Sequence, residues 1–430
     1  MKIENWLGTR KLESRGNWIV SGLCDLALML AVFMILWYVF MDPRGILRMY
    51  TPMYGYAYVQ WLLVSVLIVH FVFRLYPFQN SSFLVKKPPI VKGLILAATA
   101  VVLMLFMVNV VFKGILGTLA IPYFSEQGML DLGQNAFTAR EYAHQAITMY
   151  GGIMAMMIPL WVVHMNNWPA GEIHNWKGYL TSFLLVFAIA GFGFLIFFHP
   201  HMGVLFYPWQ TWAAVVPWWE NFSKTLSSNF CLGLIMCWTA TMWITNVTFE
   251  GYPYKKIKKQ PWRALAGIFG TLLVAVIFFN IFLLLQSLVW GEPVRGSQLL
   301  TAVDWRYLHS GECAMFMLLI ALIWGFYFKN WPHKFEPEVN MALRFVIVCV
   351  LTFAFYVFYY KFNPVLLGQQ AGYSNPLQYP LAATSLIVAL LLMHNWFFDL
   401  APGYRLANRA ELLAAEEEAE KEPVAQTTNG

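Results

Sequence analysis

Two histidine–carboxylate pairs stand near the start of apolar runs. His309 and Glu312 are three residues apart, and Glu141 and His144 have the same spacing, with Tyr142 between them. Residues three apart lie on one face of a helix. A histidine beside a carboxylate can take up and return a proton near neutral pH. We therefore expect each pair to form a proton-exchanging site at the mouth of a helix.

Further ionisable groups accompany these pairs. Asp304 and Arg306 precede His309, and they are either part of its site or a surface ion pair that contributes little. His199 and His201 close another apolar run. Two ligands two residues apart are half of a metal site, and a third would be needed. A membrane enzyme with its own metal is therefore one alternative.

The composition is that of a polytopic membrane protein. The chain has 430 residues, of which 59% are hydrophobic and only 12% charged, whereas soluble domains carry roughly 25% charged residues. The net charge of +6 comes from scattered loops and forms no basic groove, so nucleic acid is not an expected partner. The five cysteines form neither CxxC nor CxxCH, so neither an iron–sulfur cluster nor covalent haem is expected in this chain.

The apolar runs predict an all-α fold of about ten transmembrane helices, because one span needs about 20 apolar residues. The first run is too long for a signal peptide and is expected to be retained. The ten spans are predicted at 18–41, 54–76, 90–116, 144–166, 178–198, 225–248, 263–289, 308–328, 342–361 and 379–399.

Lysine and arginine set the orientation of these spans. Of the 28 basic residues, 20 lie at the N-terminus or after even-numbered spans, and 8 lie on the other side. The positive-inside rule then places both termini in the cytoplasm, in a bacterial inner membrane. The two histidine–carboxylate pairs would face the extracytoplasmic side.

Sequence motifs recur every four spans. The second and sixth spans end in Tyr76-Pro77 and Tyr252-Pro253, and the fourth and eighth end in Asn-Trp-Pro. Trp-Pro is also ordinary punctuation at a membrane interface, but two motifs in the same order favour duplication. The predicted units are a cytoplasmic arm at 1–17, four-helix repeats at 18–177 and 178–341, a final helix pair at 342–400 and a disordered acidic tail at 401–430.

Some ionisable residues lie deeper in the spans. Asp25 and His70 are each about 10 Å from the cytoplasmic face at 1.5 Å per residue, so a pair is geometrically allowed. His164 and His394 lie near the same level. Each histidine alone is more simply a hydrogen-bonding partner of a neighbouring helix. Together, Asp25, His70 and His164 are candidates for a proton path.

A quinone suits the extracytoplasmic groups best. Its carbonyls need hydrogen-bond donors, and its reduction consumes two protons. Haem b would need two histidines at matching depths, and His144 and His309 do match, but the acidic neighbours argue against a haem pocket. The expected quinone-binding residues are Glu141, Tyr142, His144, Asp304, Arg306, His309 and Glu312.

The ten-span layout, the four-helix repeat and the outward-facing polar mouths resemble the NrfD-like, or polysulfide-reductase C type, membrane subunits. The chain looks most like the ten-helix membrane subunits of menaquinone reductase complexes. The resemblance implies a haem-free protein that binds menaquinone near the outer face. It also implies peripheral iron–sulfur, molybdopterin-type or cytochrome c subunits on the extracytoplasmic face.

The sequence therefore predicts the quinone-interacting membrane subunit of a multisubunit respiratory oxidoreductase, with transmembrane proton movement as an added possibility. A secondary transporter is the main alternative, because internal repeats are common in that class. Transporters often interrupt helices at the midplane. Pro159 in the fourth span and Gly191 with Gly193 in the fifth are the positions where such breaks would fall.

Overall fold

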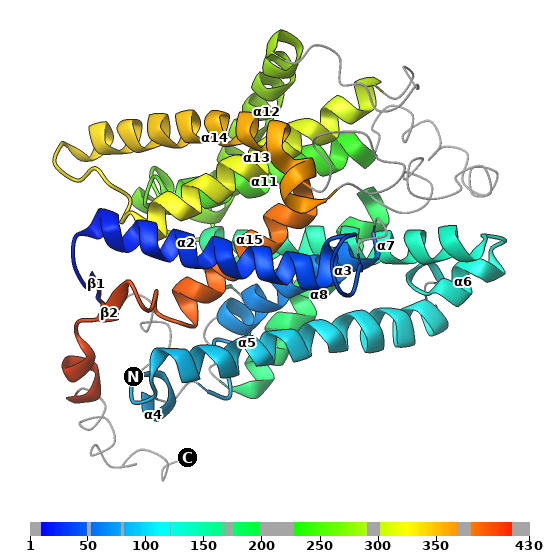
Figure 1. The fold of residues 1–430 in the computed structure, drawn as a ribbon, viewed down its shortest axis with the longest axis horizontal. Coiled ribbons are helices and arrows are strands. Elements are labelled where there is room, and N and C mark those ends of the chain that lie inside the picture. Colours follow the sequence, from blue (N-terminus) through cyan, green and yellow to red (C-terminus); the bar gives the residue numbers. More distant parts are fainter. Residues whose placement is uncertain are drawn as a thin grey trace.

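The computed structural model describes residues 10–49, 53–78, 81–120, 122–165, 167–168, 175–197, 228–289, 302–368 and 380–414. These residues form a bundle of long helices (Figure 1). Its long helices are α2 (Trp18–Leu36, continued by the π-helical η2, Trp37–Met41), α3 (Tyr54–Leu67, with η3, Ile68–Val72), α5 (Pro89–Leu105, with η4, Phe106–Ala120), α7 (Ala136–Pro159, with η6, Leu160–His164), α8 (Trp176–Phe197), α11 (Ser228–Val247), α12 (Trp262–Val289), α13 (Ala302–Tyr327), α14 (Pro337–Leu367) and α15 (Pro380–Trp396).

This is a polytopic α-helical membrane protein. Within the described ranges, nine helices are long and apolar enough to cross a membrane, and α15 is a shorter apolar helix. The spans at 18–41 and 263–289 are reproduced to within a few residues. The fourth span begins at Ala136 rather than at the predicted residue 144. Asn135 caps it by accepting a hydrogen bond from the Thr138 amide, and this polar first turn hid the helix start from the hydropathy pattern.

The helices form two layers. The second, fourth, sixth and eighth spans, which are α3, α7, α11 and α13, are 67–83% buried. The other five spans are 17–33% buried. Consecutive neighbours α3, α7, α11, α13 and α15 pack into a closed ring, and α15 returns to α3. The more exposed helices α2, α5, α8, α12 and α14 lie outside it. Hydropathy alone does not separate the two layers, because a helix that faces lipid can be as apolar all round as a helix buried in protein.

Small residues allow the closest approach within the ring. Gly233 on α11 faces Gly311 on α13, and a Cβ added at Gly233 would lie 2.2 Å from the Tyr307 carbonyl oxygen. Transmembrane helices associate by van der Waals packing, so small residues at a contact let two backbones come together. The α11–α13 contact therefore depends on glycine at position 233.

The five ring helices end in the same turn. After the last helical residues, an amide bonds back to the carbonyl oxygen six residues earlier, and a residue with positive φ closes the turn. This hydrogen bond across six residues satisfies carbonyls that would otherwise be orphaned at the helix end. The bonds run from Leu75 to Val69, Asn167 to Trp161, Gly251 to Thr245, Asn330 to Trp324 and Leu400 to His394.

The first and last described segments meet beside these turns, at what we call the strand end of the bundle. Strand β1 (Leu12–Ser14) pairs antiparallel with β2 (Tyr404–Leu406), as Figure 1 shows. Nearby, the buried Asp399 accepts hydrogen bonds from Arg10, at 3.0 Å, and from Lys92. Burial lowers the pKa of Arg10, and the Asp399 carboxylate opposes that shift. The first and last described segments are therefore joined by both backbone and charge.

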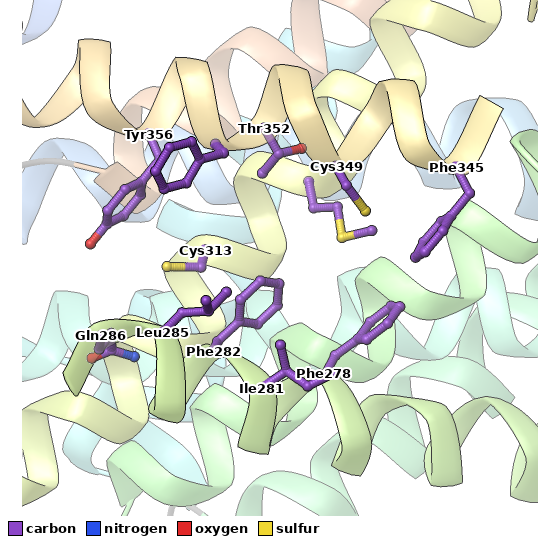
Figure 2. A pocket seen from close by; sticks show the side chains of 12 residues that line it. Phe278, Ile281, Phe282, Leu285, Gln286, Cys313, Phe345, Cys349, Thr352 and Tyr356 are labelled. Atoms are coloured by element: carbon purple, nitrogen blue, oxygen red, sulfur yellow. The ribbon is translucent and has the colours of Figure 1, made fainter. Parts of the chain in front are cut away.

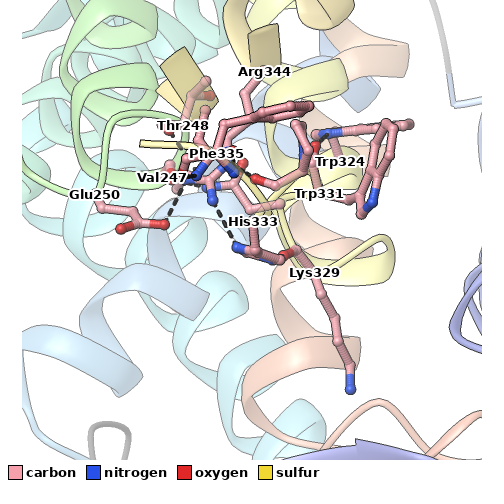
Figure 3. Close-up of polar contacts among 12 residues, drawn as sticks. Val247, Thr248, Glu250, Trp324, Lys329, Trp331, His333, Phe335 and Arg344 are labelled. Carbon is pink, nitrogen blue, oxygen red and sulfur yellow. Dashed lines mark hydrogen bonds and ion pairs between the residues drawn. The ribbon is translucent and has the colours of Figure 1, made fainter. Parts of the chain in front are cut away.

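A second polar network fixes the start of α14 at the same end (Figure 3). The buried Arg344 donates to Glu250 at 2.6 Å, to His333 at 2.7 Å and to the Pro332 carbonyl oxygen at 3.0 Å. Asn330 donates to the carbonyl oxygen of Val247. These bonds link the turn after α13 to the turn after α11, so adjacent hairpins are held in register.

The opposite end of the bundle, the α6 end, contains short helices. The segment between the predicted third and fourth spans holds η5 (Pro122–Phe124), α6 (Glu126–Asp131) and the start of α7. The short elements α4 (Ser81–Leu84) and η7 (Tyr254–Lys256) belong instead to connections at the strand end. The arm at 1–9 and the tail from 415 lie outside the described residues. The four-helix repeat stays a prediction. Within the ring, the same turn follows all five helices, so the turns do not mark a repeat of four.

Candidate functional site

His309 and Glu312 are brought together as their spacing predicts. The His309 Nδ1 lies 2.8 Å from Glu312 Oε2 on the same face of α13. On its other side, His309 Nε2 is hydrogen-bonded to the Tyr356 hydroxyl of α14. When the Glu312 carboxylate oxygen accepts from Nδ1–H, Nε2 is left to accept from the tyrosine hydroxyl. We call Tyr356, His309 and Glu312 the tyrosine relay.

A cavity of about 260 Å³ lies against this relay, between α12, α13 and α14 (Figure 2). Its walls are almost entirely apolar and include Phe278, Phe282 and Phe345. Ile281 and Phe353 also line it and are 43% and 52% exposed on the outer layer of the bundle. The cavity therefore opens to the lipid-facing side, and its volume approaches the roughly 300–1,000 Å³ typical of ligand pockets.

The polar groups of the cavity lie toward one end. Figure 2 shows Tyr356 and Gln286 on the same side of the cavity, with Cys313 between them. Gln286 Nε2 donates to Ser310 Oγ at 2.8 Å and to the Arg306 carbonyl oxygen at 3.2 Å. Its Oε1 is buried without a hydrogen-bond partner among the described residues. Tyr356 and Gln286 thus supply a hydroxyl and an amide oxygen to a largely dry site.

Glu141 and His144 share a helix face, but they engage different partners. Glu141 Oε2 accepts from the Met53 amide at 2.9 Å. His144 Nδ1 donates to the Arg140 carbonyl oxygen at 2.6 Å, because a carbonyl can only accept. The Tyr54 ring packs edge-on at 4.5 Å from the imidazole. The predicted His–carboxylate couple is therefore absent between these two side chains.

Cations and aromatic rings surround His144 instead. The Arg140 guanidinium lies 4.0 Å above the Tyr54 ring. Lys113 lies 5.4 Å from the Tyr54 ring and 5.5 Å from the Tyr58 ring, and it donates to the Tyr58 hydroxyl at 3.4 Å. Tyr142 is half-buried on α7. We call Lys113, Arg140, Tyr54, Tyr58 and His144 the cationic cluster of the first half of the chain. The tyrosine relay in the second half contains a carboxylate instead.

Asp25 and His70 do not form the pair that their depths allow. Asp25 Oδ1 accepts from the Gly403 amide at 3.0 Å. The buried His70 ring stacks on Trp396, with centroids 4.1 Å apart, and neither of its nitrogens has a partner among the described residues. Depth along two helices fixes only one coordinate, and the turn after α15 occupies the space beside Asp25.

The other histidines have mixed surroundings. His394 bridges the Tyr327 hydroxyl and the Ala401 carbonyl oxygen, both at 2.9 Å, so it has a structural role. His164 is buried, and its carbonyl oxygen accepts from Gln260 at 3.1 Å. His199, His201 and the Asp304 side chain lie outside the described residues. Within those residues, no group of three His, Cys, Asp or Glu side chains is placed to hold a metal.

A smaller cavity of about 50 Å³ lies on the axis of the ring, and all five ring helices line it. Ser385 Oγ donates to Gln60 Oε1 there at 2.9 Å, and Tyr56, Thr148 and Thr239 also contribute to the lining. Most of the other lining residues are apolar, and a cavity of this volume has room for about three water molecules beside these few polar groups. It lies between the α6 end, where Glu312 is placed, and the strand end, where His70 is placed.

The comparisons with known proteins add no identity: no family model, no curated protein and no solved structure matches this chain. What the fold defines is a class, that of polytopic α-helical membrane proteins. The particular activity must be argued from the two clusters and the lipid-open cavity.

Two residues of the cavity, Tyr356 and Gln286, escape the sequence analysis. Each lies inside a long, mostly apolar helix, 44 and 26 positions from Glu312, and no local spacing connects it to Glu312. The only signal is that a hydroxyl or amide in a lipid-facing helix needs a partner. That signal marks a residue as unusual but does not name its partner.

Proposed function

We propose that this chain is the quinone-interacting membrane subunit of a multisubunit respiratory oxidoreductase. It would exchange electrons between an extracytoplasmic redox partner and a membrane quinone such as menaquinone. The observation that carries the proposal is the apolar cavity of about 260 Å³ that opens to lipid and ends on the tyrosine relay. A lipid-soluble quinone enters such a cavity from the side, without crossing water.

The relay can deliver protons to a quinone carbonyl. When His309 carries protons on both nitrogens, Tyr356 gives its hydroxyl proton to the quinone oxygen and receives the Nε2 proton of His309. Neutral His309 then keeps its Nδ1–H on Glu312. Reprotonation of His309 and a second transfer complete the reduction, with two electrons supplied by an iron–sulfur or cytochrome c subunit.

The polar groups on the axis offer a route by which those protons are replaced. The central cavity lined by Gln60, Ser385 and Thr239 lies between the relay and the buried His70. Water held by these few polar groups would carry protons between titratable groups. We therefore include inward proton supply through His70 in the proposal. Asp25 and His164 do not line this cavity. Their part in a proton path stays a prediction from the sequence.

The transporter alternative gains no specific support from these helices. Pro159 and the pair Gly191 and Gly193 lie within helices that continue past them, since η6 follows α7 directly and α8 runs from Trp176 to Phe197. The half-helix ends that hold substrates in many transporters do not occur at these positions.

Purification in mild detergent from the native membrane tests the proposal first. Co-purifying iron–sulfur, molybdopterin-type or cytochrome c subunits, together with extracted menaquinone, are the expected result. A lone chain without quinone would contradict it, and solute uptake in vesicles would then be measured.

A blocked cavity tests the location of the quinone. Thr352→Trp fills the cavity from α14, whereas Val350→Trp places the same side chain on the lipid-facing side of that helix, where Val350 is 62% exposed. We expect Thr352→Trp to lower bound quinone per chain by about tenfold, which corresponds to roughly 1.4 kcal/mol, and Val350→Trp to leave it unchanged. Equal quinone content in both variants would place the quinone elsewhere.

A further inference from the structure

The connection between α11 and α12 carries the densest group of unpaired cations on the described strand end. Four exposed lysines, Lys255, Lys256, Lys258 and Lys259, fall within five residues, and we call them the lysine turn. In the part of the chain that the structure describes, none of the four pairs with a carboxylate. The acid nearest in sequence, Glu250, is already bonded to Arg344 (Figure 3).

The lysine turn is held in place against the membrane-spanning helix. Tyr254 packs so closely on α12 that a Cβ at Gly270 would lie 2.1 Å from its hydroxyl oxygen, and burial raises the Tyr254 pKa. Gln260 ties the segment to the end of η6 through the His164 carbonyl oxygen. The Lys255 ammonium lies 3.8 Å from the centre of the Tyr252 ring. The cations are therefore presented from an ordered turn.

An apolar stripe on α12 begins directly after these lysines. Trp262 is 60% exposed at the helix start, and Leu265, Phe269 and Leu273 follow at intervals of three or four residues with exposures of 42–64%. Tryptophan at a helix end marks the level of the lipid headgroups. The surface thus offers cations, then an interfacial aromatic ring, then a lipid-facing stripe, in the order of a phospholipid's own parts.

We propose that the lysine turn and the start of α12 form a binding site for one anionic phospholipid, with its headgroup phosphate on the lysines and its acyl chains along Leu265, Phe269 and Leu273. Juxtamembrane clusters of lysine attract anionic lipid, and basic pockets beside helices hold individual headgroups. The positive-inside rule accounts for the side of the membrane on which lysines occur, but it does not require four of them to share one ordered turn. This site is independent of the proposed quinone chemistry.

Native mass spectrometry of the full chain in neutral detergent tests the site, with phosphatidylglycerol as the probe and phosphatidylcholine of the same acyl chains as the comparison. We expect wild type to retain one phosphatidylglycerol with at least about tenfold preference over phosphatidylcholine, decreasing as salt rises. The fourfold variant Lys255→Gln, Lys256→Gln, Lys258→Gln and Lys259→Gln should lose that preference.

A matched variant removes the same charge elsewhere: Lys11→Gln, Lys86→Gln, Lys87→Gln and Lys334→Gln, all at exposed positions. It should keep the preference within about twofold. If both fourfold variants lose it equally, net charge alone attracts the lipid and the site is refuted. Displacement of phosphatidylglycerol by an equal concentration of inorganic phosphate would refute it as well, because the acyl chains would then contribute nothing.

Discussion

The two His/Glu motifs have one spacing and two different structures. In the second half, His309 holds Glu312 on one nitrogen and the Tyr356 hydroxyl on the other, and the relay ends at a lipid-open cavity. In the first half, Glu141 caps the Met53 amide, and His144 faces Tyr54. The difference comes from the neighbouring helices, because α14 supplies a hydroxyl to one motif and α3 supplies a ring and an amide to the other.

The largest expected effect separates the two histidines. His309→Ala removes the group between Tyr356 and Glu312 and should lower quinone-dependent turnover by at least about 100-fold, the usual range for a positioned acid–base group. His144→Ala should cost less than about tenfold. Turnover is measured as reduction of a soluble quinone analogue by the purified complex. If neither change affects turnover, both site assignments are wrong, and a larger loss in His144→Ala would move the quinone to the first half.

Packing around the two motifs should differ as well. A methyl at Gly233 meets the backbone oxygen of Tyr307 at 2.2 Å, whereas one at Gly151 meets only side chains, those of Gln60 at 3.0 Å and Trp61 at 3.1 Å. We expect Gly233→Ala to lower the free energy of unfolding by about 2 kcal/mol and Gly151→Ala by less than about 1 kcal/mol. Denaturation in detergent followed by circular dichroism compares the two. Equal losses would show that α11 and α13 can separate as easily as α3 and α7.

The two carboxylates test which motif needs charge. Glu312→Gln keeps the size of the side chain but removes the anion that stabilises a doubly protonated His309, so turnover should fall about tenfold. Glu141→Gln retains an oxygen for the Met53 amide and should leave turnover within about twofold. Steady-state rates of the two variants decide this, and a greater loss in Glu141→Gln would reverse the roles assigned here.

The smallest effect is expected at Tyr58. Its hydroxyl donates to Asn109 at 2.9 Å on an exposed part of the cationic cluster. Tyr58→Phe should cost less than about 1 kcal/mol of stability and leave turnover unchanged. A marked fall in turnover with normal stability, measured on the same preparation, would instead show that the cationic cluster contacts substrate.

Hydropathy and short-range spacing predict most of the fold. The spans can be recognised because a run of about 20 apolar residues is long enough to cross a membrane. His309 and Glu312 lie together because three residues are nearly one helical turn. Long-range contacts do not follow from such patterns. Tyr356 reaches His309 only because α14 packs beside α13, and Asp25 meets Gly403 because the last turn returns to the first helix. The packing of the outer helices α14 and α2 against the ring fixes these contacts, and no single stretch of sequence records that packing.

The pairing of β1 with β2 joins the segments that flank the first and the last long helices. Leu12 lies opposite Leu406, so a strand that precedes α2 pairs with a strand that follows α15. Because β2 comes after α15 in the chain, this pair cannot form until α15 has been made. The two strands therefore join the first and last long helices only after all the helices between them are present.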